Sequence, residues 1–138
     1  MLTLLIYTWF GLVLGVSFLA TPVKFRAPSL TRPVALDVGR TTFHAFGKVE
    51  WVLSVAVLVA AALDDRGLPA LVVVGIGAVV VIVVLQAAWL IPRLDVRVAA
   101  VIEGQDPPPS HLHSIYAGAE AGKALILLAV GLWSAGTP

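Results

Sequence analysis

Cysteine is absent from this sequence, and methionine occurs only at position 1. These absences exclude disulfides, thiolate metal sites, redox dithiols and sulfur-rich copper ligation. Charge is also scarce: Asp, Glu, Lys and Arg make up 12% of the chain, whereas a soluble domain of this size is usually nearer to about a quarter charged. The net charge of +1 gives no indication of nucleic-acid binding.

Apolar residues make up 59% of the chain and gather in four long runs. Each run is near or above the ~20 residues that cross a ~30 Å hydrocarbon layer as a helix. Leu68–Leu85 lacks the polar stripe that the outer face of a soluble helix would need. We therefore predict an all-α polytopic membrane protein, a single four-transmembrane-helix bundle over residues 1–138 with helices at about 2–20, 33–63, 68–91 and 111–134.

Prolines suggest where the helices begin and end. Pro22 follows the first run, and because proline cannot continue a regular helix we expect that helix to end near Ala20. Pro33 suits the first turn of the second helix. From Pro33 to Leu63 that helix would be about 46 Å long, so its first residues are expected at the interface or separated by a break near Gly39.

The last run carries ionisable residues at helical spacing: His113, Tyr116, Glu120 and Lys123 fall in one arc of roughly 80°. Ionisable side chains inside an apolar span are costly and indicate a functional site. The second helix offers partners, and we expect at least one ion pair between the two helices. The predicted substrate-binding cluster comprises Arg40, His44, Lys48, Glu50, Trp51, Gln86, Trp89, Arg97, His113, Tyr116, Glu120 and Lys123.

Positive charges are distributed unevenly between the links. Of nine Lys and Arg residues, only Arg66 belongs to the link between the second and third runs. The positive-inside rule therefore predicts both termini outside and the first and third links in the cytoplasm. The polar cluster would then lie near the cytoplasmic side of the membrane.

Several short motifs are spread over most of the chain: Pro22–Arg26, Arg40, Phe43, Phe46, Pro92, Arg97 and Leu112–His113. With these motifs the sequence resembles a small uncharacterised four-helix family of bacterial inner-membrane proteins, which is distantly similar to the membrane domain of copper-resistance D proteins. The resemblance implies a four-helix bundle and a role in transport or tolerance of a toxic solute. It does not imply copper, because the methionines and cysteines that such a site favours are missing.

We expect a small transporter or channel-like protein for an anionic or proton-coupled solute, with no catalytic residues, metal or cofactor. Its expected partners are the lipid bilayer, a small-molecule or ion substrate and further copies of the chain, which would meet along the Gly118 and Gly122 face. Nucleic acid is not expected.

Three alternatives remain open from the sequence. One is a membrane redox protein that binds haem, another metal or a quinone, with His44 and His113 as ligands. A membrane enzyme with a Glu120–His113 acid–base pair is less favoured. The third is a structural subunit of a larger membrane complex.

Overall fold

The computed structural model describes residues 1–65 and 67–136, and all regular structure in these ranges is helical. The chain runs up and down through four spans that are long and apolar enough to cross a membrane, which confirms the predicted fold class. Span 1 consists of α1 (Leu2–Val13), η1 (Leu14–Ala20) and α2 (Thr21–Lys24), and span 2 is α3 (Arg32–Ala62). Span 3 consists of α4 (Ala70–Leu85), η2 (Gln86–Leu90) and α5 (Ile91–Ile102), and span 4 is α6 (Leu112–Gly136).

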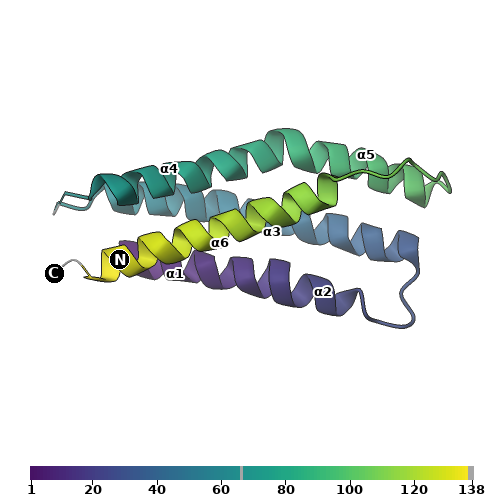
Figure 1. Ribbon diagram of the computed structural model, residues 1–138, viewed down its shortest axis with the longest axis horizontal. Helices are drawn as coiled ribbons and strands as arrows, with labels where there is room; N and C mark the ends of the chain where they lie inside the picture. Colours follow the sequence, from purple (N-terminus) through teal and green to yellow (C-terminus); the bar gives the residue numbers. More distant parts are fainter. Residues whose placement is uncertain (66, 137–138) are drawn as a thin grey trace.

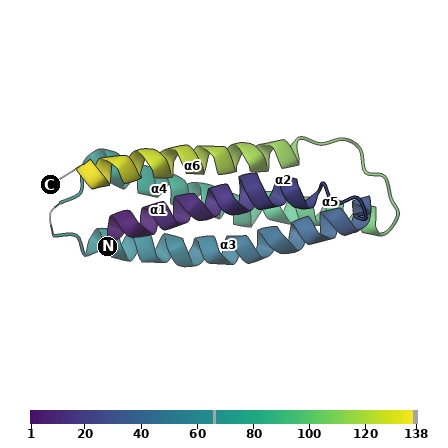
Figure 2. The same cartoon turned by 90° about the horizontal axis from the view of Figure 1, so that it is seen from below.

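Each span packs against two neighbours, so the four form a closed ring in chain order. Span 1 contacts α3 and α6, α6 contacts α4, and α3 contacts both α4 and α5. Both termini and the link between spans 2 and 3 lie at one end of the bundle, which we call the terminus end (Figures 1 and 2). The other two links lie together at the opposite end, called here the link end (Figure 2).

Two predicted helix ends, one near Pro22 and one near Pro92, are wrong. Span 1 continues past Pro22 to Lys24, and span 3 continues past Pro92 to Ile102 instead of ending near residue 91. A π-helical segment precedes each proline, η1 in span 1 and η2 in span 3. A proline removes one backbone N–H, and local π geometry inside a membrane helix pairs the freed backbone groups again.

Span 2 is one unbroken helix of 31 residues, so of the two alternatives for its first residues the break near Gly39 is wrong. At Gly39 this helix lies next to Phe25, the residue that follows span 1, and a Cβ atom there would lie 3.4 Å from Cζ of Phe25. At 1.5 Å per residue the helix is about 46 Å long, which exceeds the ~30 Å thickness of a hydrocarbon layer.

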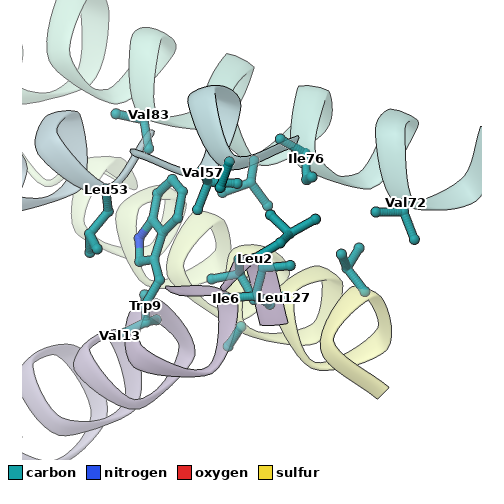
Figure 3. Close-up of a cluster of buried hydrophobic side chains, with 14 of the residues drawn as sticks. Leu2, Ile6, Trp9, Val13, Leu53, Val57, Val72, Ile76, Val83 and Leu127 are labelled. Carbon is teal, nitrogen blue, oxygen red and sulfur yellow. The ribbon is translucent and has the colours of Figure 1, made fainter. Parts of the chain in front are cut away.

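A buried apolar core fills the bundle from the middle to the terminus end. Figure 3 shows side chains of all four spans pointing toward one another there. The labelled side chains are Leu2, Ile6, Trp9, Val13, Leu53, Val57, Val72, Ile76, Val83 and Leu127. Large apolar side chains also cover the outside, for example Val74, which is 67% exposed, and Leu125, which is 69% exposed. A helix that is apolar on both its inner and its outer face is typical of a membrane span.

Candidate functional site

Three charged side chains meet inside the bundle: Glu50 of α3 and Glu120 and Lys123 of α6, which we call the buried triad. Lys123 and Glu120 are completely buried, and Glu50 is 3% exposed. The Lys123 ammonium lies 2.8 Å from Oε1 of Glu120 and also donates a hydrogen bond to Oε1 of Glu50. One ammonium therefore pairs with two carboxylates, one from its own helix and one from span 2.

The other two spans donate hydrogen bonds to the same carboxylates. From span 1, Nε1 of Trp9 donates to Oε1 of Glu50 over 3.1 Å, and Oγ of Ser17 donates to Oε2 of Glu120 over 2.9 Å. From span 3, Nε2 of Gln86 donates to Oε1 of Glu120 over 2.8 Å. The buried triad is thus the place where side chains of all four spans are linked by polar contacts.

Both π-helical segments contribute a donor to this network. Ser17 lies in η1 and Gln86 lies in η2. π-helical turns inside α-helices are frequent at functional sites. In this chain the turns that accommodate Pro22 and Pro92 are also the turns that bring two polar side chains to Glu120.

The triad lies deep in its span. Glu120 is eight residues beyond the start of α6 at Leu112, which is about 12 Å along the helix axis. Since the ammonium of Lys123 is completely enclosed, it cannot reach a headgroup as lysines near helix ends do. Two carboxylates and one ammonium carry a formal charge of −1 when all three are ionised.

A small cavity adjoins the triad, with a volume of about 10 Å³ and a lining that includes Glu50, Gln86 and Tyr116. That is roughly the room that one water molecule needs. Oε1 of Gln86 is buried and has no hydrogen-bond partner within the described residues. The cavity therefore adjoins an unsatisfied acceptor as well as a carboxylate.

An aromatic pair lies between this cavity and a larger one at the link end. The rings of Tyr116 and Phe43 are 4.3 Å apart between centroids. Tyr116 lines the small cavity, and Phe43 lines the larger one, which has a volume of about 230 Å³ and is called here the end pocket. The polar residues that line the end pocket are Arg32, Arg40, Asp95, Arg97, Ser110 and His113.

The residues predicted as one cluster therefore separate into three groups. Glu50, Gln86, Tyr116, Glu120 and Lys123 meet in the interior around the buried triad. Another group, Arg40, Arg97 and His113, lines the end pocket. The third group is more exposed: His44 and Lys48 line a shallow hollow, and Trp89 is 42% exposed. Trp51 is 44% exposed but also lines the small cavity beside Glu50, so it adjoins the interior group.

The expected ion pair between spans 2 and 4 forms through Glu50, and not through the basic residues of span 2. Arg40 pairs with Asp37 of its own helix over 2.6 Å, and Lys48 is exposed. Nε2 of His44 lies 2.8 Å from Oδ2 of Asp95 in span 3. Glu50 has the right position because it continues the buried face that Phe46 and Leu53 define on α3.

Sequence reasoning missed Trp9 and Ser17, the two contributions of span 1. A signal was available: Ile6, Trp9 and Val13 follow the 3–4 residue spacing of one helix face and are all buried. Ser17 continues this spacing and is the polar member of the series. No charge marks span 1 at this depth, so attention to charged residues alone does not find it.

The two histidines proposed as haem or metal ligands lie in different places. His44 pairs with Asp95, whereas His113 lines the end pocket. Within the described ranges, no group of three His, Cys, Asp or Glu side chains could hold a metal ion.

Comparison with known proteins gives one match. A family described as "Domain of unknown function (DUF4149)" matches residues 4–96, which include all of span 2 and most of spans 1 and 3. No curated protein and no solved structure matches the chain. The match agrees with the expected uncharacterised family, while the similarity to copper-resistance D proteins finds no support in these comparisons.

Proposed function

The chain belongs to the DUF4149 family, and we propose that it is a small membrane transporter whose buried triad binds and releases one proton. The observation that carries this proposal is the composition of the triad: Glu50 and Glu120 share one ammonium, that of Lys123. An excess negative charge is strongly unfavourable in an apolar interior unless it is paired or neutralised. A proton on either carboxyl group removes the excess.

The space around the triad favours a proton over a larger cation. The adjoining cavity of about 10 Å³ has room for roughly one water molecule, and not for an ion with its own coordination shell. Both oxygens of Glu120 already accept hydrogen bonds from Ser17, Gln86 or Lys123. A proton bound to a carboxyl group neutralises the excess negative charge and needs no additional volume in the cavity.

The Gln86 amide suits both protonation states of Glu120. It now presents its NH₂ group to the carboxylate, while its oxygen has no partner within the described residues. A half-turn of the amide would present the oxygen instead, which can accept a hydrogen bond from a protonated carboxyl group. One water molecule in the adjoining cavity would complete a short path between Glu50 and the vicinity of Tyr116.

Infrared spectroscopy of the purified protein in lipid tests proton binding. The wild-type protein should show a protonated carboxyl band that shifts on ¹³C labelling of glutamate and decreases as the pH rises. Glu50→Gln and Glu120→Gln should each abolish this band, because the remaining carboxylate is then balanced by Lys123 and stays ionised. Glu103→Gln, at an exposed position in the third link, should leave the band unchanged.

A band that persists in both triad variants, or one that is missing from the wild-type protein, contradicts a proton on the triad. Movement of the proton is a separate measurement. A pH step applied to proteoliposomes on a solid-supported membrane should give a transient current that Glu120→Gln abolishes. If the infrared band titrates but the pH step gives no current, the triad binds a proton without transporting it, and the proposed transport role is wrong.

We propose further that the link end faces the cytoplasm of a bacterial inner membrane and that both termini lie outside. The links at that end and the adjoining helix ends carry Lys24, Arg26, Arg32, Arg93 and Arg97, which is the distribution that the positive-inside rule describes. The chain has no cysteine of its own, so Ser29→Cys and Asp65→Cys can be labelled cleanly. An impermeant maleimide applied from outside should label only Asp65→Cys.

The homo-oligomer stays a prediction, and its proposed seam is accessible. A Cβ atom added at Gly118 or Gly122 would meet no atom within 4 Å. Small residues on a lipid-facing helix surface allow a second helix to approach closely.

A further inference from the structure

We propose that the end pocket binds a small amphipathic anion, a compact apolar body that carries one carboxylate, sulfonate or phosphate group. This inference deepens the proposed transport role, since it names the class of solute. It stands on different residues from the buried triad, however, and binding to the pocket can be measured without any movement of protons.

Arg97 is the residue that selects an anion. It lines the pocket and donates from Nη2 to the backbone carbonyl of Pro108, which is an uncharged acceptor. The other charged groups of the pocket are already paired: Arg40 with Asp37, Arg32 with Asp106, and Asp95 with His44. Arg97 has no carboxylate partner within the described residues. A guanidinium group binds carboxylate, sulfonate or phosphate oxygens through two parallel hydrogen bonds.

The walls of the pocket select an apolar body. They are formed mainly by Phe25, Leu36, Phe43, Leu94 and Val98. The cavity of about 230 Å³ is smaller than the ~300–1,000 Å³ sites of drug-sized ligands, so the ligand must be compact. A fully hydrated inorganic anion would leave these apolar walls unused, whereas an aromatic or short aliphatic anion would cover them.

The position of the pocket connects it to the triad. Phe43 forms part of the wall, and its ring packs on Tyr116, which lines the small cavity next to Glu50. Ile91 lines both cavities. The ring pair Phe43–Tyr116 and the side chain of Ile91 would thus separate a ligand in the end pocket from the proton site, and a change in the Phe43–Tyr116 contact would affect both cavities.

Binding can be tested with naphthalene-2-sulfonate, on the full-length protein in nanodiscs of zwitterionic lipid, by titration calorimetry against empty nanodiscs. The wild-type protein should bind this anion more tightly than the uncharged analogue 2-naphthol. Arg97→Gln should weaken the binding by at least about tenfold, the usual effect of a lost charge-assisted hydrogen bond. Arg93→Gln is the matched control, because Arg93 stacks on Trp89 outside the pocket and should leave the affinity unchanged.

Leu36→Trp supplies a second variant that fills the cavity and keeps every charge, and it should weaken binding as Arg97→Gln does. Equal effects of Arg93→Gln and Arg97→Gln, or unchanged binding in Leu36→Trp, would overturn the proposal, because the anion would then bind to the surface. Nanodiscs doped with phosphatidylglycerol identify the source of the ligand. Unchanged binding of the sulfonate in these nanodiscs supports a water-soluble anion as the ligand. Competition by phosphatidylglycerol would assign the anion site to a lipid headgroup and overturn the proposal of a compact solute.

The two proposals fail separately. If the wild-type protein does not bind the anion but its infrared band still titrates, the end-pocket proposal is wrong and the triad remains a proton site. If the protein binds the anion but the infrared band is missing, the end pocket remains an anion site and the proposal of a proton site at the triad is wrong.

Discussion

The apolar core at the terminus end and the buried triad hold the same four spans together by different physical means. The core consists of aliphatic side chains, Trp9 and Phe46, with no charge among its buried members. The triad joins the spans by ion pairs and hydrogen bonds between side chains that, apart from the partly buried Ser17, are almost completely buried. The lipid is as apolar as the core, so burial of apolar surface alone drives little association of membrane helices.

This difference determines how each region specifies the fold. The core depends on shape, and its glycines show where shape matters: a Cβ at Gly131 would lie 2.9 Å from the ring of Tyr7, and one at Gly75 would overlap Cγ2 of Val130. The triad depends on the presence of each partner, since a buried charge without its partner finds no substitute in lipid. Substitutions in the two regions should therefore differ in the size and the kind of their effects.

The largest effect is expected for Lys123→Met. It removes the ammonium group that pairs with both Glu50 and Glu120 and leaves two buried carboxyl groups. Breaking a buried ion pair by removal of one partner typically costs about 3–5 kcal/mol. We expect a loss of that order in the free energy of unfolding, measured by SDS titration in mixed micelles.

The control for this variant removes all three charges together. In Glu50→Gln/Glu120→Gln/Lys123→Met no buried charge remains, and much of the lost stability should return, because replacing a whole buried ion pair is far less costly than breaking it. If Lys123→Met is as stable as the wild-type protein, the triad does not hold the spans together and the contrast with the apolar core disappears.

A smaller effect is expected from Gly75→Ala in the apolar region. The added methyl group would overlap Cγ2 of Val130, a side chain of the facing helix α6 with little freedom to move. Overpacking of this kind costs about 1–3 kcal/mol. Gly77→Ala, two residues along the same helix, meets no atom within 4 Å and should be neutral or slightly stabilising in the same unfolding assay. Equal effects of the two substitutions would mean that helix propensity, and not shape, determines stability in this region.

The sequence was sufficient to predict the four spans and the inward direction of Glu120 and Lys123, because hydropathy and helical spacing are local properties of the chain. It was not sufficient for the helix ends at Pro22 and Pro92, where π-helical segments accommodate the missing N–H groups. The division of the cluster into a triad and an end pocket was also not predictable. Arg40 and Glu50 occur on the same helix, but packing against α1 and α5 decides which side chain becomes enclosed.

The smallest effect is expected for Asp95→Asn, which tests charge pairing outside the bundle interior. Asp95 pairs with His44 over 2.8 Å, but the side chains remain 31% and 49% exposed, so water screens the interaction. Exposed pairs contribute about 0.2–1 kcal/mol, and we expect a loss in that range in the unfolding assay used for Lys123→Met. Asp37→Asn, which removes the carboxylate beside Arg40 at similar exposure, should cause a similarly small loss.

A loss as large as that of Lys123→Met would show that the link end stabilises the bundle as strongly as the triad does. The difference between the two regions would then not follow from burial.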